Sequence, residues 1–191
     1  MSKIITVNDY FKNKNKILNH IKKGLVFIYP TDTIYGIGCD ATNVRAVSRL
    51  REAKKRDKKP FSIIAPSKSW IKRNCVVNNK AKEWLDKLPG KYTLILKLKS
   101  NKVIAKNVNL GTGKIGVRIP KKWSALIAKD LNRPIISTSA NITGEPFMTS
   151  LEDLNPRVKE HIDLIISEGS KKARPSKIID LTRNKVITTK R

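Results

Sequence analysis

The feature that most constrains this chain is an apolar strand that runs directly into a cluster of small polar residues ending on glycine. The segment covers residues 134–144 and reads P-I-I-S-T-S-A-N-I-T-G. A second segment, 25–38, follows the same plan and reads L-V-F-I-Y-P-T-D-T-I-Y-G-I-G. Short hydroxyls and an amide beside a glycine suit a phosphate or ribose, and ligands of open α/β sheets bind just beyond strand ends. Taken alone, each segment is equally compatible with an ordinary polar loop.

Helix starts and apolar strands alternate along the rest of the chain. The sequence predicts helix starts at Asn8 or Asp9, at Asn43, at Asn78 or Asn79, and at Asn155 with Pro156 behind it. Further strands are predicted at 61–65, 92–98, 115–119, 162–166, 177–181 and 185–189, the last two joined by a tight turn at 183–184. This mixture predicts an α/β fold with a mixed, twisted sheet, and one domain covering residues 1–191.

Composition narrows the class of protein. No apolar run reaches the ~18 residues of a membrane-spanning helix, and the N-terminus lacks a signal-peptide pattern, so we expect a cytoplasmic protein without a membrane. Cys39 and Cys75 are too few for a disulfide framework, and we expect both to be reduced packing residues. His20 and His161 fall in separate helical segments, and no His/Cys metal cluster is visible.

The charge of the chain is strongly positive. Forty-one Lys and Arg residues face 15 Asp and Glu residues, giving a formal net charge of +26. A field of this size attracts polyanions. A lysine-rich solvated surface explains the same count, so charge by itself does not establish nucleic-acid binding.

Six segments, in order, resemble the motifs of the YrdC-like threonylcarbamoyl-AMP synthase family. They read P-T-x-T-x-Y-G-x-G at 30–38, K-x-R at 54–56, P-G-x-x-T at 89–93, V-R-x-P at 117–120, S-x-S-A-N-x-T-G at 137–144 and P-S-x-I-I-D at 175–180. Shared order and spacing make the resemblance specific. It implies a YrdC-like open twisted mixed sheet with flanking helices and a concave basic face.

The resemblance also implies a reaction. L-threonine, bicarbonate or CO2, and ATP would form threonylcarbamoyl-AMP and pyrophosphate, and a partner threonylcarbamoyl transferase would use the product to modify tRNA. Such a step requires anionic reactants held in line and phosphate charge neutralised, rather than a protein nucleophile. Mg²⁺ would arrive with ATP and be held mainly by its phosphates.

Site residues follow from the matching motif positions. For ATP the resemblance implies Lys54 and Arg56, which are also the expected catalytic residues, together with Lys59, Ser139, Asn141, Arg174 and Ser176. For threonine it implies Thr33, Ser137 and Arg118, the last on the carboxylate, while Thr31 ties down its own loop. We expect Lys54 and Arg56 to stand at an exposed helix end.

The chain departs from the family pattern at a few positions. Asp57 replaces the proline that usually follows the K-x-R arginine, Lys91 replaces a proline of the P-G-P-x-T pattern, and strand 61–65 lacks a His that many relatives carry near threonine. The main alternative function is a non-catalytic module that binds tRNA or double-stranded RNA, which the charge favours. Such a module does not require hydroxyls at strand ends, and the aromatic pairs and G-x-x-G clamps of known RNA binders are missing. Carbamoyl transfer in hydrogenase maturation, another reaction of YrdC-like domains, is disfavoured by the absence of zinc motifs.

Overall fold

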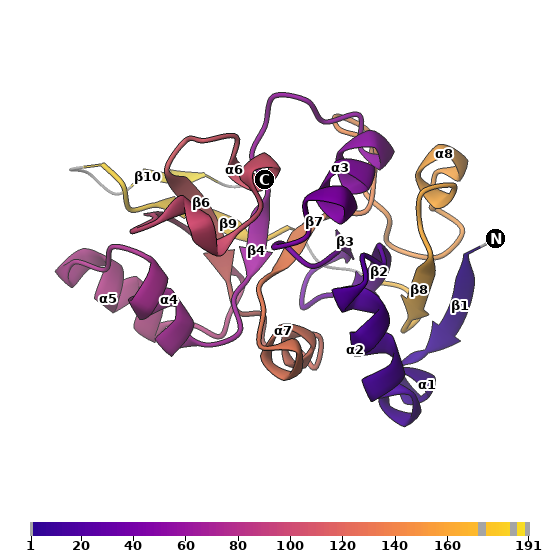
Figure 1. The fold of residues 1–191 in the computed structure, drawn as a ribbon. Coiled ribbons are helices and arrows are strands. Elements are labelled where there is room, and N and C mark those ends of the chain that lie inside the picture. The colour runs from indigo at the N-terminus through magenta and orange to yellow at the C-terminus, as the bar shows by residue number, and fades with distance from the viewer. Residues whose placement is uncertain (1, 172–174, 184–186, 190–191) are drawn as a thin grey trace.

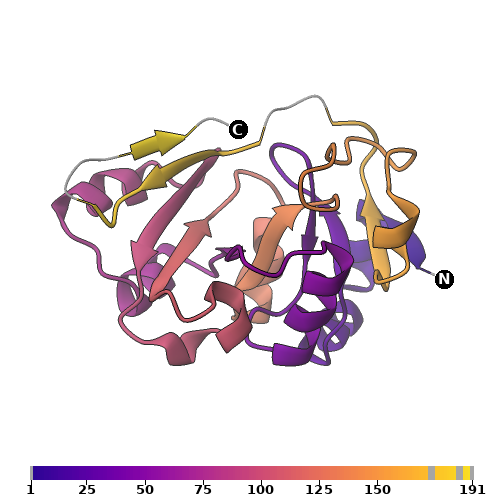
Figure 2. The ribbon, with the colours of Figure 1, turned by 90° about the horizontal axis from the view of Figure 1, so that it is seen from above.

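The computed structural model describes residues 2–171, 175–183 and 187–189. These residues form one ten-stranded sheet with helices against it (Figure 1). The sheet runs across the molecule from β1 near the N-terminus to β10 at the opposite end (Figures 1 and 2). Its spatial order is β1-β8-β2-β3-β7-β4-β6-β5-β9-β10.

The strands pair in both directions. Their bounds are Lys3–Thr6 (β1), Phe27–Pro30 (β2), Tyr35–Gly38 (β3), Ser62–Ile64 (β4), Tyr92–Lys97 (β5), Lys114–Arg118 (β6), Ile135–Ser139 (β7), Leu164–Ser167 (β8), Lys177–Asp180 (β9) and Ile187–Thr189 (β10). β8 lies parallel to β1 and β2, β4 lies parallel to β6, and β5 lies parallel to β9. The remaining neighbours are antiparallel, so the predicted open mixed sheet with flanking helices is confirmed.

Side-chain caps begin most of the described helices. The helices are Val7–Lys12 (α1), Lys14–Lys22 (α2), Val44–Ala53 (α3), Lys68–Asn74 (α4), Asn79–Asp86 (α5), Lys106–Asn109 (α6), Ala125–Leu131 (α7) and Pro156–Lys159 (α8), with a 3₁₀ turn at Asn101–Val103. Asn43, Asn78 and Asn155 cap α3, α5 and α8 as predicted. The start of α1 was predicted slightly late, because Thr6 is its cap and Asp9 completes a capping box with it.

The two faces of the sheet bury separate apolar clusters. Neighbouring residues of one strand point to opposite faces, so Ile136 belongs to one cluster and Ile135 to the other. Ile63 and Ile64 divide in the same way, and all four side chains are fully buried. Strands covered on both faces read as continuous apolar runs, which explains the sequence pattern at 63–65 and 134–136. No described helix is long and apolar enough to span a membrane.

β7 joins the two halves of the sheet. Its Ser139 and Thr138 pair with β3, and its Ser137, Ile136 and Ile135 pair with β4. At Gly38 in β3, a Cβ atom would lie 2.8 Å from the Ile136 carbonyl oxygen. Glycine is therefore required there because two backbones approach closely. This pairing places the two polar segments of the sequence side by side.

Candidate active site

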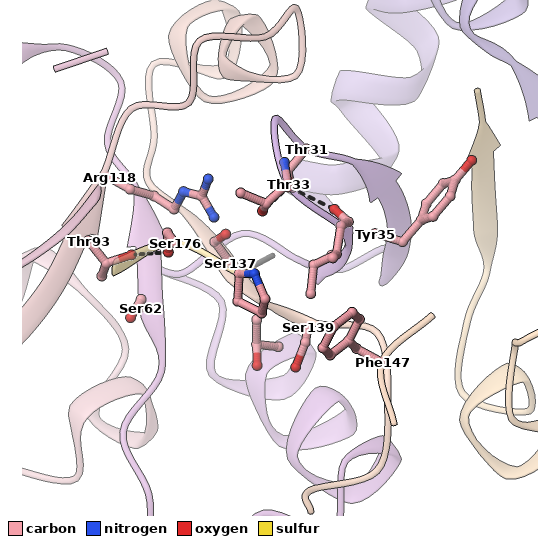
Figure 3. A pocket seen from close by; sticks show the side chains of 14 residues that line it. Thr31, Thr33, Tyr35, Ser62, Thr93, Arg118, Ser137, Ser139, Phe147 and Ser176 are labelled. Carbon is pink, nitrogen blue, oxygen red and sulfur yellow. Dashed lines mark hydrogen bonds between the residues drawn. The ribbon is translucent and has the colours of Figure 1, made fainter. Parts of the chain in front are cut away.

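A cavity of about 200 Å³ lies where the two polar segments meet (Figure 3). Five of the predicted site residues line it, namely Thr33, Arg118, Ser137, Ser139 and Ser176. They come from the β2–β3 loop, β6, β7 and the approach to β9, so segments far apart in sequence build one site. In Figure 3 the side chains of Arg118, Thr33 and Ser137 converge.

Hydrogen bonds fix the loop between β2 and β3. The Thr31 hydroxyl donates to the Ile34 carbonyl oxygen at 2.7 Å and accepts from the Thr33 backbone N–H at 3.1 Å. The Thr31 and Thr33 hydroxyls also lie 2.9 Å apart. Thr31 therefore ties down the loop, as expected, and holds Thr33 at the cavity wall.

Arg118 is buried and forms an ion pair. It is 6% exposed, and its Nη2 donates to the carboxylate of Asp32 from the β2–β3 loop. A second oxygen of Asp32 accepts from the Lys121 backbone N–H at 3.2 Å. The Arg118 Nε is buried and has no acceptor among the described residues. An unsatisfied buried donor is costly, and because the Arg118 side chain also lines the cavity, its guanidinium is placed to bind an anion there.

Lys54 lies beneath the polar loop, which contradicts the expected exposed helix end. Its side chain is 1% exposed at the C-terminal end of α3. Its Nζ donates to the carbonyl oxygens of Ser139 and Asn141, both at 2.6 Å, and to Asn141 Oδ1 at 3.0 Å. The α3 helix ends against the β7 loop rather than in solvent, so this lysine holds the loop in place.

Asn141 is also committed to the loop. Its Nδ2 donates to the Glu145 carbonyl oxygen at 2.6 Å, and its Oδ1 accepts from the Ser139 hydroxyl at 2.6 Å as well as from Lys54. Asn141 is 9% exposed and is not among the described residues that line the cavity. Ser139 does line it. The predicted contact of Asn141 with the nucleotide stays a prediction. Its hydrogen bonds show in addition that Asn141 supports the loop.

Arg56 and Lys59 line an adjoining cavity of about 350 Å³. Ser62 and Thr93 form walls of both cavities, so the two spaces share a boundary. The Arg56 guanidinium donates to the carbonyl oxygens of Lys59 and Pro60 at 3.2 and 2.7 Å. Of the described residues predicted to bind ATP, Ser139 and Ser176 therefore line the first cavity and Arg56 and Lys59 line its neighbour, while Lys54 and Asn141 line neither. Arg174 lies outside the described residues.

Thr93 and Ser62 are site residues that sequence reasoning missed. Thr93 is 4% exposed, and its hydroxyl lies 2.8 Å from that of Ser176, which closes one side of the cavity. Thr93 ends the P-G-x-x-T motif, so its motif position was the available signal. Ser62 is a polar residue at the start of an apolar strand, and that contrast was the signal for it.

Gly116 supports this wall from β6. A Cβ atom at Gly116 would collide with the Ser62 hydroxyl, and Gly116→Ala should therefore push Ser62 into the cavities. We expect kcat/KM for the reaction proposed below to fall roughly 10-fold or more, because small misplacements in a site are costly. Steady-state kinetics would measure the loss, with Ser62→Ala as the matched control. The double variant Ser62→Ala/Gly116→Ala removes the shortest contact, although the Cβ atom of residue 62 at 3.1 Å and Thr93 Cγ2 at 3.2 Å remain close, and it should recover part of the activity. A double variant as slow as Gly116→Ala would contradict this account.

Nucleophilic and metal-binding groups are scarce near the site. Both cysteines are free and buried, as predicted. Burial raises the pKa of the Cys75 thiol to about 12 and raises the pKa of Cys39 as well, so neither is a thiolate at neutral pH. Residues 2–171, 175–183 and 187–189 contain no group of three or more His, Cys, Asp or Glu side chains placed to hold a metal ion. The cavity offers hydroxyls and one guanidinium, which suit binding and orientation.

The chain is similar in sequence to known proteins. The family described as "Telomere recombination", that of Sua5, YciO and YrdC, matches residues 19–191. A Methanocaldococcus jannaschii protein named provisionally as a threonylcarbamoyl-AMP synthase is 35% identical over 97% of this chain and 89% of its own. The threonylcarbamoyl-AMP synthase of Vibrio campbellii is 31% identical over 92% of this chain and 98% of its own.

Two solved structures agree with the fold. Escherichia coli YciO superposes with a TM-score of 0.86 at 27% identity, covering 100% of this chain and 95% of YciO. P. abyssi Sua5 complexed with L-threonine superposes with a TM-score of 0.81 at 29% identity, covering 98% of this chain. This chain spans 56% of that Sua5 chain. From the motif segments, the ten-stranded sheet and these matches, we conclude that the chain belongs to the Sua5/YciO/YrdC family.

Proposed function

We propose that this protein is a threonylcarbamoyl-AMP synthase, which makes threonylcarbamoyl-AMP and pyrophosphate from L-threonine, bicarbonate or CO2, and ATP. The observation that carries the proposal is the buried Arg118 guanidinium, which lines the cavity in a wall of hydroxyls next to the S-x-S-A-N loop and whose Nε lacks an acceptor in the described part of the chain. The names of the two curated relatives and the threonine complex of Sua5 support it. We further propose that residues 1–191 act as one catalytic domain.

The reaction requires orientation of three reactants. The threonine amine adds to CO2 and loses a proton to form a carbamate. A carbamate oxygen then attacks the α-phosphorus of ATP, and the bond to the β-phosphate oxygen breaks to release pyrophosphate. Arg118 would hold the threonine carboxylate, and Thr33 and Ser137 would contact the rest of the amino acid. Fixing both reactants in line supplies most of the rate gain for such a step.

ATP would extend along the wall that the two cavities share. Ser139 and Ser176 line the first cavity, close to where the attacked phosphate would sit. Arg56 and Lys59 line the second cavity and would neutralise the outer phosphates. Lys54 would act on this site by holding the Ser139–Asn141 loop. Magnesium enters as MgATP, and a cavity wall of hydroxyls fits an ion held mainly by phosphate oxygens and water.

The biological setting follows from the product. We propose the cytoplasm as the location, because ATP and tRNA are both available there, and a threonylcarbamoyl transferase as the enzyme that consumes the product to modify tRNA. The +26 net charge supports loose binding of tRNA through phosphate contacts, which weakens steeply as salt rises. The same charge is the observation that favours the alternative, an RNA-binding module without catalysis.

The defining experiment follows pyrophosphate release and adenylate formation. The protein is incubated with MgATP while threonine, bicarbonate and tRNA are each left out in turn. We expect release only when both threonine and bicarbonate are present, and no requirement for tRNA. Serine should be the poorer substrate by roughly 10- to 200-fold, the scale of one missing methyl group.

Two results would contradict the proposal. ATP cleavage that is equally fast without threonine would exclude the synthase reaction. Adenylate formation that depends on tRNA, or tRNA binding that stays tight at high salt, would favour the RNA-binding alternative.

A further inference from the structure

The charge balance of the first cavity points to the kind of ligand it accepts. Among the described residues that line it, Arg118 carries the only charged side chain, and the others are hydroxyl, aliphatic or aromatic. Arg118 is paired with Asp32, and the two side chains are 7% and 6% exposed. Water therefore screens this pair weakly. The described wall of the cavity therefore presents the Arg118 cation, whose charge the buried Asp32 carboxylate already balances.

Asp32 is fixed in place from both sides. One of its oxygens accepts from Arg118 and the other accepts from the Lys121 backbone N–H. Its neighbours Thr31 and Thr33 are tied by the loop hydrogen bonds described above. Both oxygens of the carboxylate are thus held beside Arg118, so an incoming anion meets the Asp32 charge together with the Arg118 charge.

We propose that Asp32 makes this cavity selective for a zwitterion, an α-amino acid whose carboxylate binds Arg118 and whose ammonium group offsets Asp32. A plain carboxylate would leave two anions sharing one guanidinium in a weakly screened site, whereas a zwitterion adds no net charge. Asp32 acts through Arg118 and is a positioning residue. The inference rests on the proposed function and adds to it the residue that favours an amine-bearing substrate.

Other charges near Asp32 leave this balance in place. Lys171 lies close enough to interact with Asp32, but it also lies 3.9 Å from Glu168, which pairs with Lys122. Lys171, Glu168 and Lys122 are not among the described residues that line the cavity. Within residues 2–171, 175–183 and 187–189, Arg118 therefore remains the cation that a ligand in the cavity would meet, and Asp32 remains its direct partner.

The test compares L-threonine with (R)-3-hydroxybutyrate, which is the same molecule without the amine. Binding of each is measured by calorimetry, with and without a non-hydrolysable ATP analogue, for the wild type, Asp32→Asn and Asp40→Asn. Asp40 is the matched control, because it is fully buried and forms an ion pair with Arg133 in which the nitrogen and oxygen lie 2.9 Å apart. Neither residue is among the described residues that line the cavity. We expect the wild type and Asp40→Asn to bind threonine much more tightly than (R)-3-hydroxybutyrate. Asp32→Asn should lower this ratio of affinities roughly 10-fold or more, which is the scale of one nearby charge in a weakly screened site.

Each outcome decides the inference. A threonine preference that Asp32→Asn leaves unchanged, even if both ligands bind more weakly, would assign Asp32 a purely structural role. Should Asp32→Asn fail to fold, the wild type alone decides, because equal affinity for the two ligands would overturn the inference. Failure of the wild type to bind threonine at all would instead overturn the proposed function.

Discussion

Replacing Arg118 with alanine should lower kcat/KM for threonine roughly 10²- to 10³-fold while leaving ATP binding largely intact. Removing one partner of a buried charge-assisted contact typically costs about 2–5 kcal/mol. The threonine carboxylate would lose the only described cation that lines the first cavity. Calorimetry with threonine and with an ATP analogue would measure the two affinities separately. Threonine affinity within a few-fold of the wild type would show that the carboxylate binds elsewhere.

The same substitution should also destabilise the fold, because Asp32 would remain buried without its partner. Breaking a buried pair in this way costs about 3–5 kcal/mol. The double variant Asp32→Asn/Arg118→Gln removes both charges and should recover much of that stability without recovering threonine affinity. Thermal unfolding followed beside calorimetry would separate the effects. A double variant that binds threonine normally would show that the single variant failed through misfolding.

Lys54→Ala should impair both stability and catalysis. It would leave the carbonyl oxygens of Ser139 and Asn141 without the lysine ammonium that they accept from. The Ser139 oxygen would still accept from the Asn141 backbone N–H at 3.1 Å, whereas the Asn141 oxygen would lose its lysine donor. An unsatisfied buried acceptor costs about 1–3 kcal/mol, so we expect a loss of that size and a melting temperature lower by about 2–12 °C. With the loop displaced, kcat/KM should fall roughly 10²-fold.

The matched control for Lys54 is Lys58→Ala, which removes an exposed lysine from the same basic segment. Surface substitutions of this kind usually change stability by less than about 0.5 kcal/mol. Differential scanning calorimetry and pyrophosphate release would be measured for both variants. A Lys54→Ala protein that is as stable as Lys58→Ala would contradict the supporting role given to Lys54.

Local signals in the sequence predicted local structure well. Asn43, Asn78 and Asn155 start helices because each side chain accepts from a backbone N–H two or three residues ahead. The apolar runs predicted strands because a strand that is buried on both faces carries apolar residues at successive positions. The short α4 helix was missed, although its Ser67 cap is also local and accepts from the Trp70 N–H at 3.0 Å.

Contacts between distant segments could not be predicted from the sequence. The pair of Asp32 with Arg118 joins residues 86 positions apart, and no local pattern reports it. Apart from its place in the K-x-R motif, Lys54 looks like Lys55, Lys58 and Lys59 in the sequence, and its burial arises because α3 brings it under the β7 loop. The motifs therefore predicted which segments form the site, while the partners of each charge required the fold.

The position of β7 links the site to the integrity of the whole sheet. Ser137 and Ser139 line the cavity, and the same short strand is the seam between the two halves of the sheet. A change in its register would separate those halves as well as displace the hydroxyls. Inside a cell, harmful substitutions in this strand would therefore appear as reduced abundance, because quality-control proteases remove the loosened chain before any slow turnover could be observed.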